Sequence, residues 1–110
     1  MGGNRCIVAA LIRIGAPGLL PFLKARLQEP EPEVRRVAAD GLARVALASE
    51  LPLLVQLAHD PDWSIRNHAG WGLGRLGLPQ GRDALLALVR DTEPVVARTA
   101  RAALAKLPAA

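Results

Sequence analysis

The chain has 110 residues, of which 51% are hydrophobic and only 3% aromatic, with a formal net charge of +4 and a single cysteine. The apolar content argues against a disordered chain, and one cysteine excludes an internal disulfide or a thiolate-rich metal site. A basic chain of one domain's length permits an acidic or nucleic-acid partner without requiring one.

The first predicted element is a helix over residues 4–14, the most uniformly apolar segment of the chain. It is interrupted by Arg13 and is too short to cross a bilayer, and no signal-peptide pattern is present. We therefore expect a soluble, cytoplasmic protein without a membrane partner. Because a helix that is apolar all round is normally covered on several sides, we expect self-association through residues 4–14, or a need for a longer chain.

The rest of the chain repeats with a period of 31 residues, since residues 29–45, 60–76 and 91–107 align without gaps. A fixed period of this length is typical of stacked repeats. The positions that are identical between the first two copies are Pro30/Pro61, Arg35/Arg66, Ala38/Ala69, Gly41/Gly72, Leu42/Leu73 and Arg44/Arg75, and those shared by the last two include Asp60/Asp91, Ala69/Ala100, Leu73/Leu104 and Leu76/Leu107.

Each copy predicts a short helix, called A, followed by a longer helix, called B. The A helices are expected at residues 17–28, 50–59 and 80–90, and the B helices at 33–46, 63–76 and 94–107. The helix at 4–14 would then be an unpaired B helix. We expect one domain over residues 1–110, an all-α solenoid of about 3.5 repeats. Its start in mid-repeat suggests a fragment, a truncated product or one end of a dimer.

Apolar residues at helical spacing indicate which faces are buried. Pro21 and Pro52 suit the first turn of an A helix, and Ser49 is a candidate N-cap. The expected buried positions are Leu20, Leu23 and Leu27, then Leu51, Leu54 and Ala58 in the A helices; in the B helices they are Val34, Ala38, Leu42 and Val45, then Ile65, Ala69, Leu73 and Leu76, then Val96, Ala100, Leu104 and Leu107.

The segments Pro32 to Ala39 and Leu57 to Gly77 resemble HEAT repeats of the short bacterial type associated with phycobilisome lyases, and the resemblance covers essentially the whole chain. It implies an armadillo-like, right-handed solenoid with A helices on the convex side and B helices on the concave side. It also implies that acidic turn residues bond the early arginine of a B helix between repeats. The matching positions are Glu29, Asp60 and Asp91 for the acid and Arg35 and Arg66 for the arginine, with Ala97 replacing the third arginine.

No pattern for catalysis is present, so we expect a protein that is not an enzyme and has no cofactor. Cys6 has no predicted base beside it and is read as a small buried hydrophobe. His59 and His68 lie on different helices without a third ligand. Three glycines, Gly70, Gly72 and Gly74, lie inside one helix rather than in a phosphate-binding loop. We interpret them as sites of close contact, with Trp63 or Trp71 as the expected neighbour.

A stripe at i, i+4, i+8 spacing runs along every B helix, off the buried face. Three readings are open: a solvated face, a protein-binding face and a nucleic-acid-binding face. The stripe consists of Arg5, Ala9 and Arg13, then Arg36, Asp40 and Arg44, then Asn67, Trp71 and Arg75, and then Arg98, Ala102 and Lys106.

The leading hypothesis is a non-catalytic scaffold that binds an unidentified protein on the concave face, with the stripe from Arg36 onward as the binding residues, Ala102 excepted. The alternative is a tRNA- or DNA-binding accessory module of a larger enzyme, because Arg66 to Trp71 is similar to a segment of the HEAT-like domain of epoxyqueuosine reductases. A phycobilin-lyase-type subunit is a further alternative. Weak, non-specific binding to nucleic acid is also expected.

Overall fold

The computed structural model describes residues 18–108, and every regular element in that range is helical. The predicted all-α class is therefore confirmed there, whereas the helix at residues 4–14 lies outside the described residues and its self-association stays a prediction. The elements in chain order are α2 (Leu19–Arg26), α3 (Pro32–Val45), η1 (Ala48–Glu50), α4 (Leu51–Leu57), α5 (Trp63–Leu76), η2 (Pro79–Gly81), α6 (Arg82–Leu88) and α7 (Pro94–Leu104).

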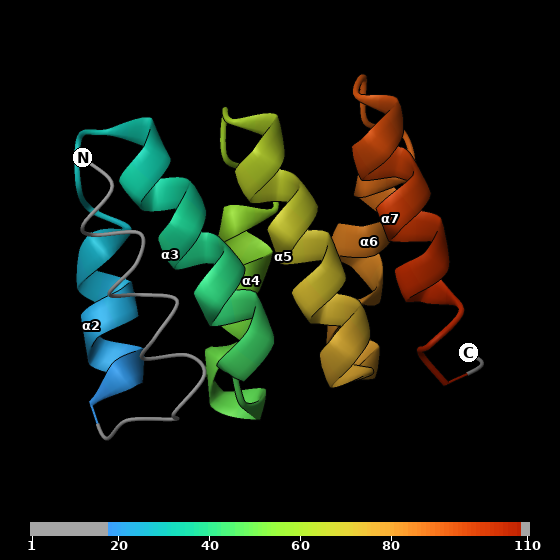
Figure 1. Ribbon diagram of the computed structural model, residues 1–110. Helices are drawn as coiled ribbons and strands as arrows, with labels where there is room; N and C mark the ends of the chain where they lie inside the picture. Colours follow the sequence, from blue (N-terminus) through green and yellow to red (C-terminus); the bar gives the residue numbers. More distant parts are fainter. Residues whose placement is uncertain (1–17, 109–110) are drawn as a thin grey trace.

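The helices form two layers. The B helices α3, α5 and α7 stand side by side in one layer, and the A helices α4 and α6 lie behind them (Figure 1). Each B helix packs along its neighbouring B helix, whereas the A helices contact chiefly B helices. The B helices thus pack on one another more closely than the A helices do, which is consistent with a curved stack that has its B helices on the inner side.

The B helices begin within one residue of the predicted positions, and two of the three begin with a proline whose fixed φ suits a first helical residue. The A helices are shorter than predicted: each ends two residues earlier, and the 3₁₀ turns η1 and η2 occupy the predicted first residues of α4 and α6. Ser49 lies inside η1 and makes no cap bond, so the expected N-cap at this position is wrong.

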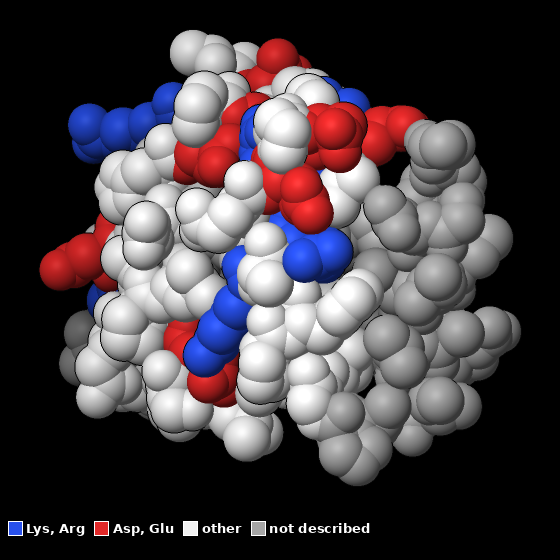
Figure 2. All heavy atoms as spheres, turned by 90° about the vertical axis from the view of Figure 1, so that its left-hand side faces the viewer, with Lys and Arg blue, Asp and Glu red and all other residues white. Residues whose placement is uncertain are grey.

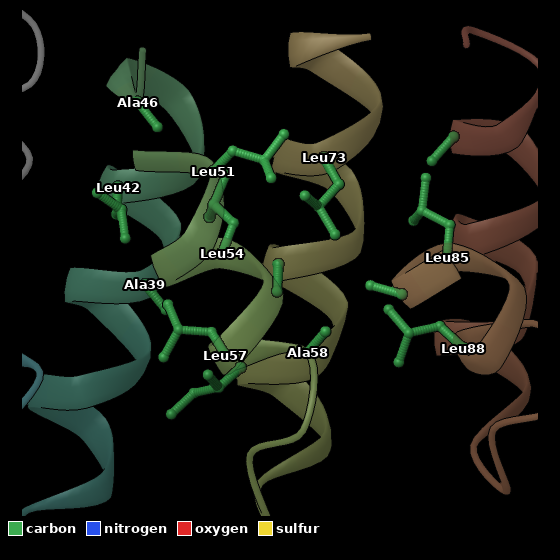
Figure 3. Packing of buried hydrophobic residues seen from close by; sticks show 14 of the residues in the cluster. Ala39, Leu42, Ala46, Leu51, Leu54, Leu57, Ala58, Leu73, Leu85 and Leu88 are labelled. Atoms are coloured by element: carbon green, nitrogen blue, oxygen red, sulfur yellow. The ribbon is translucent and has the colours of Figure 1, made fainter. Parts of the chain in front are cut away.

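A continuous core fills the space between the two layers, as the leucines and alanines labelled in Figure 3 show. Leu23, Leu42, Leu54, Leu73 and Leu85 are each fully buried. The expected buried positions are confirmed for all but five residues. The residues that are only half-buried are Leu20, Val34, Val45, Leu76 and Leu104. All five lie in the first or last turn of their helices, where neighbouring helices cover less of the surface.

The neighbouring B helices approach one another through small residues. A Cβ atom on Gly72 would lie 3.1 Å from Ala43 of α3, and one on Gly74 would lie 2.6 Å from the Cβ of Ala103 in α7. A Cβ on Gly70 would meet only side-chain ends, those of Leu85, Leu88 and Thr99. The glycines are therefore sites of close contact, as predicted, but their neighbours are the adjacent repeats and not Trp63 or Trp71.

We expect Gly74→Ala to destabilise the protein, because the new methyl group overlaps the backbone of Ala103. Overpacking of this kind costs about 1–3 kcal/mol, which outweighs the roughly 1 kcal/mol gained from better helix propensity. Gly70→Ala in the same helix is the matched control, since Leu88 can move its side chain. Urea unfolding followed by circular dichroism measures both; a Gly74→Ala variant as stable as Gly70→Ala would contradict the close approach.

Glu50 is the one buried charged residue among residues 18–108. Its carboxylate accepts the backbone N–H of Leu47 at 3.0 Å, the hydroxyl of Ser49 at 3.0 Å and the ammonium of Lys24 at 3.4 Å. The pKa of Glu50 is below its ordinary value, chiefly because Leu47 donates to it, while burial acts in the opposite direction. The carboxylate therefore joins the A helices α2 and α4.

Because the native pKa of Glu50 is lowered, its contribution to stability is present above its ordinary pKa and is lost as pH falls through the native value. We expect the free energy of unfolding to fall between about pH 5 and pH 3, less steeply in Glu50→Gln than in the parent protein. Urea unfolding across this range provides the measurement. Asp83→Asn, which removes an exposed carboxylate, is the control. Equal slopes in Glu50→Gln and the parent would rule out this role.

Candidate interaction surface of the B helices

The turns that precede the B helices are acidic. Glu29, Glu31 and Glu33 surround the turn between α2 and α3, and acidic side chains gather at the top of this end of the molecule (Figure 2). Asp62 is the N-cap of α5 and accepts the N–H of Ser64 at 2.9 Å. Carboxylates here face the positive ends of the helix dipoles, so one edge of the B layer is acidic.

Arginines early in the B helices connect these turns to the next repeat. The guanidinium of Arg66 donates to both carboxylate oxygens of Asp91, at 2.8 and 3.0 Å. Its third nitrogen donates to the carbonyl oxygens of Asp60 and Pro61 in its own turn. The hydrogen bond from Arg66 holds the pKa of Asp91 below its ordinary value. The link that the family resemblance implied is therefore present at the second junction.

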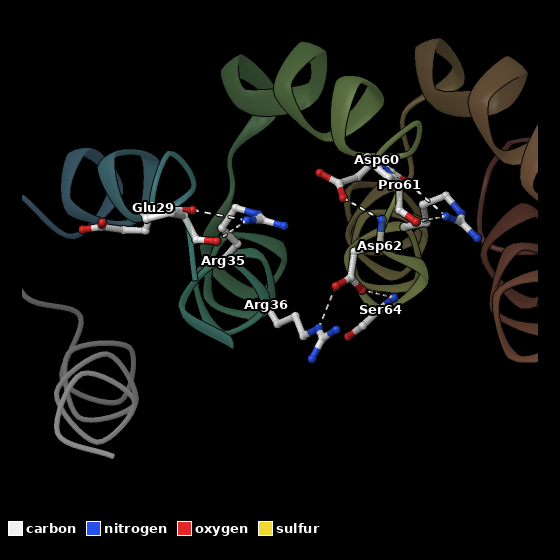
Figure 4. Close-up of polar contacts among 9 residues, drawn as sticks. Glu29, Arg35, Arg36, Asp60, Pro61, Asp62 and Ser64 are labelled. Carbon is white, nitrogen blue, oxygen red and sulfur yellow. Dashed lines mark hydrogen bonds and ion pairs between the residues drawn. The ribbon is translucent and has the colours of Figure 1, made fainter. Parts of the chain in front are cut away.

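The first junction departs from that expectation. Arg35 donates only to the carbonyl oxygens of Glu29 and Pro30 in its own turn. The link to the next repeat is made by Arg36, whose Nε lies 2.7 Å from Oδ2 of Asp62 (Figure 4). The expected pairing of Arg35 with Asp60 is wrong, since the Asp60 carboxylate instead accepts the N–H of Asp62.

The predicted stripe residues from Arg36 onward are exposed or half-buried on the B layer, whereas Arg5, Ala9 and Arg13 lie outside the described residues. Arg44 lies over the ring of Trp71, with 5.8 Å from its guanidinium carbon to the ring centroid. Asp40 lies 3.7 Å from His68 and accepts a hydrogen bond from Arg44 at 3.0 Å. The structure therefore brings together Asp40, Arg44 and Trp71, with His68 as a residue that the stripe did not include.

A polar cleft of about 300 Å³ lies between α3 and α5 beside this group. Burial lowers the pKa of His68 below its ordinary value, although the charge of Asp40 opposes this effect, so the imidazole is neutral near pH 7. The cleft thus offers an uncharged donor or acceptor next to paired charges. Its lining residues are Glu33, Arg36, Val37, Asp40, Ser64 and His68.

Arg75 has a structural role that its position in the stripe did not indicate. Its Nε donates to the carbonyl oxygen of Ala43 at 2.8 Å, and its Nη2 donates to that of Ala46. Both acceptors belong to the C-terminal end of α3, where backbone carbonyls lack partners within the helix. Arg75 therefore caps the helix of the preceding repeat.

The remaining polar stripe residues make fewer contacts with the neighbouring helices. Asn67 is half-buried, and its Oδ1 atom is buried without a hydrogen-bond donor. Arg98 on α7 and Lys106, which follows the end of α7, are exposed. Neither forms an ion pair within residues 18–108. They are the two stripe cations available for contact with another molecule.

The part of the chain that the structure describes contains no group of three His, Cys, Asp or Glu side chains placed to hold a metal ion. In the same part, no helix has the length and apolar character needed to span a membrane.

Comparison with known proteins supports the same architecture. A family model described as HEAT repeats matches residues 20–105. A search of curated proteins found no match.

We expect Arg75→Ala to lower stability by about 1 kcal/mol, because two carbonyl oxygens of α3 lose a charged donor at a partly exposed site. Arg98→Ala removes an arginine from the same stripe without a partner in the described residues, so its effect should lie within about 0.5 kcal/mol. Thermal or urea unfolding compares the two variants. If both changes had the same effect, Arg75 would not be a cap.

Proposed function

Because the chain belongs to the HEAT repeat family, we propose that it is a non-catalytic scaffold that binds a partner protein on the exposed side of α3, α5 and α7. HEAT repeats commonly serve as protein-interaction scaffolds, and the family is generally non-catalytic. The proposed binding surface is the stripe of Arg36, Asp40, Arg44, Asn67, Trp71, Arg75, Arg98 and Lys106.

Trp71 is the observation that carries the proposal. Its ring is 41% exposed at the centre of the B layer, with Arg44 over it and the polar cleft of Asp40 and His68 nearby. A large aromatic side chain is costly to leave in water and is enriched at the centres of protein interfaces. Neighbouring charges that are already paired would form a rim that orients the partner.

The pairing of the arginines favours a protein over a nucleic acid. Arg36 is bonded to Asp62, Arg44 to Asp40, and Arg75 to backbone carbonyls of α3. A phosphate backbone would have to displace these partners, and affinity for nucleic acid depends on cations that neutralise phosphates. Only Arg98 and Lys106 of the stripe are free of such partners within the described range. This supports weak, non-specific binding to nucleic acid at most.

The 31-residue period, short for a HEAT unit, supports placing the chain with the short bacterial type. We propose a cytoplasmic scaffold rather than a subunit that acts on a bilin or a tRNA.

The test compares affinity capture by the immobilised protein with capture by Trp71→Ala and Trp63→Ala. Trp63 is the matched control, because it is an equally exposed tryptophan at the start of the same helix. We expect a protein retained by the parent and by Trp63→Ala to be lost by Trp71→Ala, with Kd raised at least about 30-fold in a direct titration.

Fluorescence anisotropy with single-stranded RNA and DNA at several salt concentrations tests whether the partner is instead a nucleic acid. Tight binding that weakens steeply with salt, and that Trp71→Ala abolishes, would replace the protein partner by a nucleic acid.

A further inference from the structure

The last helix pair carries an open groove on the side away from α5. The groove has a volume of about 800 Å³ and lies between α6 and α7. These two helices stand at the end of the stack (Figure 1). Leu86 at its rim is 49% exposed. The full lining is Leu86 and Ala87 from α6, Val89 and Arg90 from the turn that follows α6, and Arg101 and Leu104 from α7.

The equivalent positions of the inner repeats are covered. Leu104 corresponds by the 31-residue period to Leu73 and Leu42, which are both fully buried, whereas Leu104 is half-exposed. Val89 corresponds to Ala58, which is also buried. The groove is therefore the surface that, in earlier copies, is closed by the following helix pair.

The end surface differs from the second junction at two positions. Position 101 corresponds to Gly70, where even a Cβ atom would lie 3.3 Å from Leu88 of the following repeat. The side chain of Arg101 occupies this place, and Ala97 stands where Arg66 bonds the following turn. The end surface thus lacks the small residue found at Gly70 and Ala39 and the arginine of the second junction, while Arg98 stands in the register of Arg36.

The charges of the groove point to an acidic occupant. Arg90 and Arg101 line it with no acidic side chain among its lining residues, and neither is ion-paired within residues 18–108. Between them lie the aliphatic side chains of Leu86, Val89 and Leu104. A groove between two helices that combines an apolar floor with cationic sides is complementary to a helix with an apolar stripe and flanking carboxylates.

We propose that the end groove between α6 and α7 binds an acidic amphipathic helix of a partner protein. Aliphatic side chains of the partner helix pack against Leu86, Val89 and Leu104, and its carboxylates pair with Arg90 and Arg101. This site does not include Trp71 and is independent of the proposed binding surface on the B layer.

The test uses a fluorescein-labelled peptide of about 18 residues, with leucine at i, i+3 or i+4, and i+7 and glutamate beside the stripe. A second peptide carries lysine in place of each glutamate. Fluorescence anisotropy should show that the parent protein binds the acidic peptide and not the basic one. Arg101→Glu should weaken binding of the acidic peptide at least about tenfold and create binding of the basic peptide. Leu86→Glu should abolish binding of the acidic peptide.

Leu47→Glu, at an exposed leucine between α3 and α4, is the control for adding a carboxylate elsewhere, and Trp71→Ala reports binding on the B layer. Circular dichroism confirms that each variant is folded. Equal affinity of the acidic peptide for the parent and for Arg101→Glu would overturn the proposal, and so would loss of binding in Trp71→Ala alone. A parent dimer in light scattering that Leu86→Glu dissociates would also overturn it, because the groove would then bind a second copy.

Discussion

The close approach of neighbouring B helices is the constraint on which the rest of the structure depends. Ala43 lies against Gly72, and Gly74 lies against Ala103, at distances that leave no room for another methyl group. This spacing brings the Arg66 guanidinium within 3.0 Å of the turn of the next repeat and lets Arg44 reach the ring of Trp71. Polar contacts between repeats are short-range and directional, so they form only when small residues hold the helices at this separation.

Charge on the B layer follows from the direction of its helices. All three B helices point the same way (Figure 1), so their acidic N-terminal turns share one edge, with Arg44, Arg75 and Lys106 toward the other. Asp62, Asp91 and Arg75 bond to the neighbouring repeat, and Arg44 pairs with Asp40 in its own helix. The layer is therefore rich in arginine and yet offers few cations without a partner among the described residues.

The period was sufficient to predict the all-α fold and the starts of the B helices, because proline and acidic residues mark each start. It could not predict which side chains meet between repeats. The contacts of Arg36 and Arg66 with the following turn span 26 and 25 residues rather than the 31 of the period. The cap formed by Arg75 was not predictable either, since its acceptors are backbone carbonyls, which carry no signal in the sequence. The role of Glu50 was missed because its strongest partner is likewise a backbone group.

The small-residue contacts also fix the order of the repeats. The first junction places its methyl group on the earlier helix, at Ala43, and the second places it on the later one, at Ala103. The middle repeat, with glycine at both positions, is thus an adapter between unlike neighbours. Its removal would set Ala43 against Ala103 with two methyl groups in a space for one, and its tandem duplication would set Gly74 against Gly72 with none. Although the units share one period, they are not interchangeable modules.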